Sequence, residues 1–131
     1  MKEPVWIEER EILVLHDRLL ALFGGLPGLR DRGLLQSALA RPRQHHAYRD
    51  APNIVALAAA YTVGIVRNHP FIDGNKRTGF VAGALFLELN SYRFAASEEA
   101  SAQAVLEVAA GNLDESGYEA FLRATVLRRK K

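Results

Sequence analysis

Cysteine is absent from this sequence, and so are long apolar runs. Without cysteine the chain can form no disulfide bond and no thiolate metal site, which suits a cytoplasmic protein. Every apolar stretch is interrupted well short of the ~20 residues that span a bilayer, so we expect no membrane association. Residues 1–11 carry charges throughout and hold no apolar segment, so we also expect no signal peptide.

Three further patterns are missing. No segment alternates apolar and polar residues for long enough to predict a sheet. No Gly-x-x-x-x-Gly-Lys-[Ser/Thr] run occurs, which excludes a P-loop. No repeat or low-complexity segment occurs. What remains is a chain of 131 residues, 49% hydrophobic and 24% charged, which predicts one globular domain over residues 1–131.

The net charge of +2 comes from the C-terminal end. Residues 123–131 hold five of the 17 basic residues, and the rest of the chain has 12 basic and 15 acidic residues, a net charge of −3. Basic residues are favourable at a helix C-terminus in solvent. This cluster lacks the interleaved aromatic residues of a nucleic-acid surface, so we expect a solvated tail and no direct nucleic-acid binding.

The spacing of apolar residues predicts six successive helices. Their predicted ranges are 6–23, 32–40, 53–68, 75–90, 97–111 and 115–129. Glycines and a proline at 24–28 end the first helix, and Pro42 is expected to end the second. Residues 43–52 show no period and predict an exposed loop or flap, whereas residues 92–94 predict a short extended piece.

The helices at 53–68 and 75–90 are apolar on nearly all faces, which is typical of helices in the middle of a fold. We therefore predict an all-α fold, a compact bundle of about six helices with a short flap. Gly79 and Gly83, four residues apart, are expected to let a neighbouring helix or an adenine approach closely. His16 lies on the apolar side of its helix and is expected to be a satisfied core histidine.

The loop between these two helices carries the functional signal. The helix that follows the loop begins with Gly74, Asn75, Lys76 and Arg77. Two cations therefore face the positive end of a helix dipole. That placement is unfavourable unless an anion binds there. Glycine, the free N–H groups of a helix start, lysine and arginine together predict a phosphate site.

Two more residues of this loop fit the same chemistry. Asp73 would repel a phosphate unless a cation lies between them, which points to Mg²⁺. His69 carries an imidazole, the side chain that most often serves as a general base, and is the candidate for that role. Other roles stay open at this point: Asp73 could cap the helix, Lys76 and Arg77 could be solvated, and His69 could be a turn residue.

The run His69-Pro-Phe-Ile-Asp-Gly-Asn-Lys-Arg77 resembles the signature of the Fic/Doc superfamily, His-x-Phe-x-[Asp/Glu]-Gly-Asn-[Gly/Lys]-Arg, at every position. Segments such as 23–31 and 85–90 are similar to its death-on-curing (Doc) branch, and the likeness covers about residues 5–125. The resemblance implies the helical Fic fold, His69 as general base, Asp73 as the Mg²⁺ ligand, and ATP phosphates held by Gly74, Asn75 and Arg77.

Lys76 stands where the AMP-transferring branch has a second glycine. In the Doc branch this lysine goes with transfer of the γ-phosphate of ATP to a threonine of elongation factor Tu, which stops translation. The resemblance therefore implies the toxin of a toxin–antitoxin system acting as a protein kinase. An AMP transferase and a catalytically decayed binding module are the alternatives.

The resemblance also implies two protein partners, a target and an inhibitor. Fic-type proteins dock their target segment at a flap, here expected at residues 43–52 with Tyr48 and Arg49 as contacts. The self-inhibitory run [Ser/Thr]-x-x-x-Glu-[Gly/Asn] of some Fic proteins does not occur in the sequence. Inhibition is therefore expected from a separate antitoxin, whose C-terminal helix would lie in a groove beside the loop. Arg67 could reach the phosphates, although a surface role is favoured.

Overall fold

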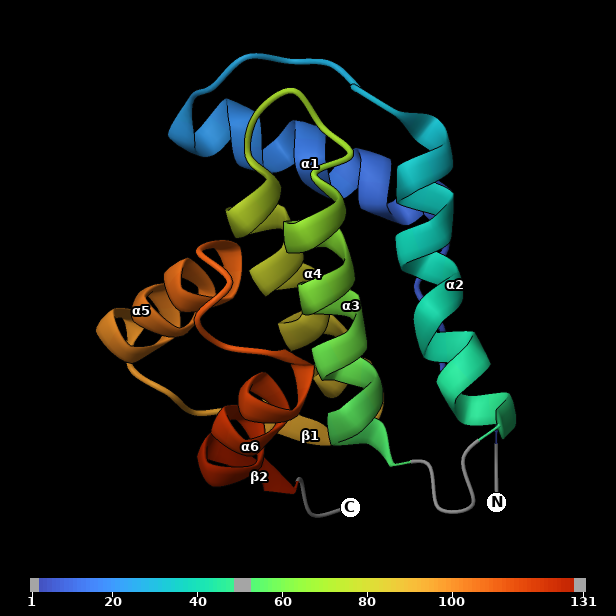
Figure 1. Ribbon diagram of the computed structural model, residues 1–131, viewed down its shortest axis with the longest axis vertical. Coiled ribbons are helices and arrows are strands. Elements are labelled where there is room, and N and C mark those ends of the chain that lie inside the picture. Colours follow the sequence, from blue (N-terminus) through green and yellow to red (C-terminus); the bar gives the residue numbers. More distant parts are fainter. Residues whose placement is uncertain (1–2, 49–52, 129–131) are drawn as a thin grey trace.

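The computed structural model describes residues 3–48 and 53–128, and six helices and two short strands lie within them. In chain order these are α1 (Glu9–Phe23), α2 (Arg32–Tyr48), α3 (Ile54–Asn68), α4 (Asn75–Leu89), β1 (Tyr92–Phe94), α5 (Glu98–Ala109), α6 (Glu115–Thr125) and β2 (Val126–Arg128). Figure 1 shows the other helices arranged around α3 and α4, with α1 crossing one end of this pair. The predicted all-α bundle is confirmed.

Helix α3 is the centre of the molecule. Its residues 55–66 are all buried, as the apolar faces of this helix predict. Helix α4 packs directly against it, because Gly79 and Gly83 leave room for the α3 backbone. A Cβ on Gly83 would lie 2.2 Å from Thr62 Oγ1, and one on Gly79 would lie 2.8 Å from a Val66 methyl group. The two glycines therefore serve the helix contact rather than an adenine.

Helix α2 corrects the sequence analysis. It continues through Pro42 to Tyr48, so Pro42 does not end it, and residues 43–48 are not a flap. Contacts outside the helix compensate for the hydrogen bond that proline removes: Pro42 itself is buried, Arg41 pairs with Glu115, and Arg43 pairs with Glu8. The rest of the expected flap, residues 49–52 with Arg49, lies outside the described residues.

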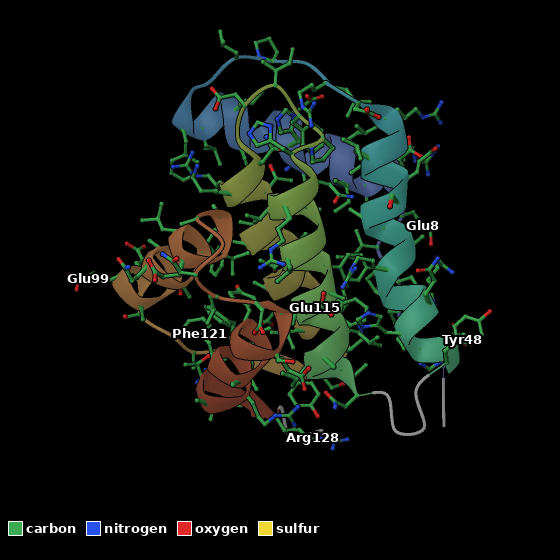
Figure 2. The ribbon with its side chains drawn as sticks, viewed as in Figure 1. Glu8, Tyr48, Glu99, Glu115, Phe121 and Arg128 are labelled. Carbon is green, nitrogen blue, oxygen red and sulfur yellow. The ribbon has the colours of Figure 1, made fainter. Side chains whose placement is uncertain are left out.

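The end of α2 is also far from the loop that carries the functional signal. Tyr48 projects from the outer end of α2 (Figure 2), close in sequence to the first residue of α3, whereas the loop follows the last residue of α3. The 15 residues of α3 separate these two ends by about 22 Å at 1.5 Å per residue. Tyr48 therefore lies away from the candidate site.

The C-terminal part of the chain adds a small sheet. β1 confirms the extended piece expected at residues 92–94, and it pairs antiparallel with β2, Phe94 opposite Val126. The last helix was expected to reach residue 129, but α6 ends at Thr125. Pairing with β1 favours an extended backbone there, and helical spacing alone gives no sign of such a distant partner. No helix within the described ranges is both long and apolar enough to cross a membrane.

Candidate functional site at the start of α4

The α3–α4 loop opens into a cavity of about 210 Å³. The cavity is lined by His69, Asp73, Gly74, Asn75, Lys76 and Arg77. These are the six site residues predicted from the sequence, so the structure brings all of them together at one place. Their arrangement follows from how α3 ends and how α4 begins.

His69 ends α3 in a left-handed conformation, with φ 53° and ψ 53°. Its N–H still donates to Ile65 O at 3.1 Å, and Pro70 then prevents the helix from continuing. A non-glycine residue in this conformation costs about 1–3 kcal/mol and needs support from its surroundings. The conformation leaves the imidazole exposed on the cavity, where it is accessible to a reacting group.

Two aromatic residues anchor the middle of the loop in the core. Phe71 is buried and stacks on His16, with ring centroids 3.7 Å apart and planes 9° apart. His16 Nε2 donates to the backbone O of Asp73 at 2.8 Å, since a carbonyl can only accept. His16 is thus the satisfied core histidine that the sequence predicts. It also fixes the backbone of Asp73, a role that the sequence analysis missed.

Asn75 closes the loop on itself. Its buried side chain accepts from Phe71 N at 2.9 Å and donates to Phe71 O at 2.9 Å. Both ends of the side-chain amide are therefore used inside the protein. The backbone N–H of Asn75 comes before the helical ladder and can face a bound phosphate.

Asp73 is held as a carboxylate by backbone amides. Leu26 N–H donates to Oδ2 at 3.0 Å and Gly74 N–H donates to Oδ1 at 2.9 Å. These two hydrogen bonds, the bond from Leu26 first, lower the pKa of Asp73 below its usual value. The N-cap of α4 is Gly74, and Asp73 makes no side-chain cap hydrogen bond to the helix. The capping role left open by the sequence is therefore not observed.

The start of α4 has the features of an anion site. Gly74 adopts φ 80°, which glycine tolerates at no steric cost. Thr78 N–H makes the first intrahelical bond, to Gly74 O at 2.9 Å, so the amides of residues 75–77 precede the helical ladder and can face a ligand. Lys76 and Arg77 are both exposed at the cavity.

The donor set of the cavity suits a magnesium ion that arrives with a phosphorylated ligand. Among the residues that the structure describes, Asp73 is the only carboxylate that lines the cavity. Within residues 3–48 and 53–128, no three His, Cys, Asp or Glu side chains gather as a metal cluster. Mg²⁺ commonly takes one or two protein carboxylates and fills its remaining positions with phosphate oxygens and water. An ionised Asp73 beside free helix amides meets that requirement.

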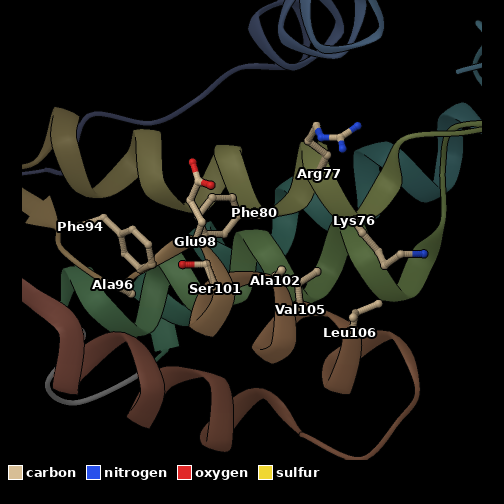
Figure 3. A pocket seen from close by; sticks show the side chains of 10 residues that line it. All are labelled: Lys76, Arg77, Phe80, Phe94, Ala96, Glu98, Ser101, Ala102, Val105 and Leu106. Carbon is tan, nitrogen blue, oxygen red and sulfur yellow. The ribbon is translucent and has the colours of Figure 1, made fainter. Parts of the chain in front are cut away.

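A second cavity, of about 480 Å³, adjoins the first along α4 and shares Lys76 and Arg77 with it. Figure 3 shows its lining side chains, which come from α4, α5 and the segment between them. Phe80 and Phe94 meet edge to face at 5.3 Å between ring centroids, and Glu98 lies beside them.

Arg67 lines neither cavity. Its guanidinium donates to Leu113 O at 3.0 Å. The favoured surface role of Arg67 is what the structure shows.

Comparisons with known proteins identify the family of this chain. The model of the Fic/DOC family matches residues 6–87. The chain is similar to the protein named "Protein kinase doc" of Escherichia phage P1, with 32% identity over 117 residues, 89% of this chain and 92% of that protein. It is also similar to "Toxin Doc" of Mycolicibacterium smegmatis, with 44% identity over 75 residues, 56% of this chain and 58% of that protein. The chain belongs to the Fic/DOC family, on the death-on-curing branch that its loop predicts.

Proposed function

We propose that this chain is a Doc-type toxin that acts as a protein kinase, transferring the γ-phosphate of ATP to a hydroxyl group of a protein. One observation carries the proposal. An exposed imidazole, an ionised carboxylate and the cationic start of α4 line a single cavity of about 210 Å³. Its relative from Escherichia phage P1 is named a protein kinase, which supports a phosphotransferase of the same kind.

His69 is the proposed general base. The acceptor hydroxyl oxygen forms a bond to the γ-phosphorus, the bond from that phosphorus to the bridging oxygen of ADP breaks, and the hydroxyl proton passes to the imidazole. The left-handed backbone at His69 presents the ring to the cavity. Because the ring is exposed, it can lose the proton to water after each turnover.

The start of α4 is the proposed phosphate-binding site. The backbone amides of residues 75–77, the Lys76 ammonium and the Arg77 guanidinium would bind phosphate oxygens, while Asp73 would hold Mg²⁺ against them. When bound, the ion neutralises charge that develops between the β- and γ-phosphates. Lys76 also narrows the space that a glycine at this position would leave, which favours γ-phosphate transfer over AMP transfer.

A threonine of elongation factor Tu is the proposed acceptor, with translation arrest as the consequence. An antitoxin is the proposed inhibitor. The cavity of about 480 Å³ between α4 and α5 is the proposed groove for its C-terminal segment, because apolar side chains line it beside the cations of the first cavity. A helix with one apolar face and a carboxylate at its end would complement both features.

The proposal is tested by incubating the purified chain with ATP labelled at the γ-phosphate, Mg²⁺ and elongation factor Tu. We expect label on the factor with wild type, and at least about 100-fold slower transfer with His69→Gln, as for loss of a general base. Mass spectrometry of the product then separates the alternatives, since phosphate and AMP differ in mass. An AMP adduct would favour the nucleotidyl transferase. Cellular toxicity that survives His69→Ala would favour a binding module.

A further inference from the structure

The connection between α1 and α2 lies directly against the candidate active loop. Figure 1 shows it passing over the end of α3 and α4 where the loop turns. Ile72 N–H donates to Gly28 O at 3.0 Å, and Leu29 forms an isolated antiparallel bridge with Phe71. Residues 28–29 of this connection are therefore paired with residues 71–72 of the loop. Arg30, the next residue of the connection, makes further hydrogen bonds to the loop.

Arg30 binds three successive carbonyl groups of the loop. Its Nε donates to His69 O at 2.7 Å, its Nη2 donates to Asn68 O at 3.0 Å, and its backbone N–H donates to Pro70 O at 2.7 Å. The two side-chain bonds reach carbonyls at the C-terminal end of α3. These carbonyls carry the negative end of the helix dipole, so a fixed cation is favourable there.

The backbone of His69 needs this support. Helices that end in a left-handed residue usually place glycine there, whereas this chain places an imidazole at φ 53°. A non-glycine residue stays in that region only when its surroundings determine its conformation. The fork of Arg30 fixes the orientation of the peptide planes on both sides of the His69 Cα, and these planes set the direction of the Cα–Cβ bond.

We propose that Arg30 is a positioning residue that holds the His69 imidazole in the cavity by clamping the carbonyl groups of Asn68 and His69. The inference rests on the proposed role of His69 as general base. Arg30 itself lines neither cavity, so it acts through His69 and not on a ligand. Its planar fork supplies two parallel donors, which a lysine ammonium cannot reproduce in the same geometry.

The test compares Arg30→Met, Arg30→Lys and a matched control, Arg32→Met. Arg32 is exposed, lies two residues away, and its guanidinium pairs with Glu9 of α1 at 2.8 Å instead of with the carbonyl groups that Arg30 binds. Phosphate transfer from ATP is measured for the full chain with each substitution. We expect kcat to fall about 10-fold or more in Arg30→Met, because small misplacements of a catalytic group have large effects on rate. The KM for ATP should stay within about twofold of the wild-type value, since the substitution does not alter the proposed phosphate-binding site at the start of α4.

Arg30→Lys should lose less activity than Arg30→Met, and Arg32→Met should match wild type. A kcat of Arg30→Met within about twofold of wild type would overturn the inference. If Arg30→Met does not fold, Arg30→Lys decides: a folded protein with wild-type kcat overturns the inference, and one with reduced kcat and unchanged KM supports it.

A second readout does not depend on activity. The Cε1–Hε1 resonance of His69, assigned by its loss in His69→Gln, reports the surroundings of the ring. We expect this resonance to move or broaden in Arg30→Met and to stay in place in Arg32→Met. An unchanged resonance overturns the inference even if wild type transfers no phosphate. A shifted resonance with an inactive wild type would instead contradict the proposed function alone.

Discussion

The guanidinium carbon of Arg77 lies 4.2 Å from the centroid of the Phe23 ring. Phe23 is the last residue of α1 and is 60% exposed, so its ring is open to a cation on one face. Stacking of this kind is worth about 0.5–1 kcal/mol at an exposed site. We interpret Phe23 as the residue that keeps the Arg77 guanidinium at the rim of the proposed phosphate-binding cavity.

Replacing this ring should therefore weaken nucleotide binding. In Phe23→Leu we expect the Kd for Mg–ATP to rise about two- to fivefold, which corresponds to the loss of the stacking energy. Isothermal titration calorimetry measures the change. Leu22→Ala is the matched control, because Leu22 is its exposed neighbour on α1 and has no ring for Arg77. Equal Kd values for wild type and Phe23→Leu would show that Arg77 is oriented by other contacts.

Asp73 predicts a pH-dependent contribution to stability. The hydrogen bonds from Leu26 and Gly74 lower its pKa in the folded state, so the folded protein favours the carboxylate. The resulting stabilisation is present above the pKa of about 3.9 that an aspartate has in the unfolded chain, and it is lost as the pH falls through the lower folded value.

In Asp73→Asn we expect a lower Tm than in wild type at neutral pH, because the amide oxygen cannot accept both hydrogen bonds in the same geometry. The difference in Tm should shrink when the pH drops below about 4. Circular dichroism melts from pH 7 to pH 3 measure it. A Tm difference that grows on acidification would contradict this assignment.

His16 should matter for both stability and activity. His16→Phe keeps an aromatic ring against Phe71 but removes the donor to Asp73 O. Leaving that carbonyl without its partner should lower the free energy of unfolding by about 1–3 kcal/mol. It should also reduce kcat, because the Asp73 backbone is no longer fixed. Urea denaturation and phosphate transfer give the two values, and unchanged values in both would refute the role.

A methyl group at Gly83 should destabilise the fold. A Cβ there would lie 2.2 Å from Thr62 Oγ1, so Gly83→Ala should destabilise the protein by about 1–3 kcal/mol through overpacking. The added Thr62→Ala substitution removes the clashing oxygen. The cost of Gly83→Ala should then be smaller in the Thr62→Ala background by at least about 0.5 kcal/mol. Additive costs in urea denaturation would mean that the clash lies elsewhere.

The sequence determined the helical fold and the composition of the site. The apolar faces of residues 53–68 and 75–90 predict two central helices, because an all-round apolar helix is stable only when buried. The site residues lie within nine consecutive positions, 69–77, so a local pattern sufficed to find them. The same pattern could not show that the Asn75 side chain hydrogen-bonds to the backbone of Phe71, since that pairing depends on how the loop folds back.

Only the tertiary structure decided how the loop is held and where α2 ends. Arg30 and Leu26 are more than 35 residues from the groups they bind, and no local periodicity encodes a contact at that distance. The helix through Pro42 likewise depends on tertiary contacts, since Pro42 itself is buried and its neighbours pair with Glu8 and Glu115, and local sequence preference does not reveal them. Local sequence patterns therefore identify the candidate site residues of this protein. Tertiary packing determines the positions of these residues relative to one another.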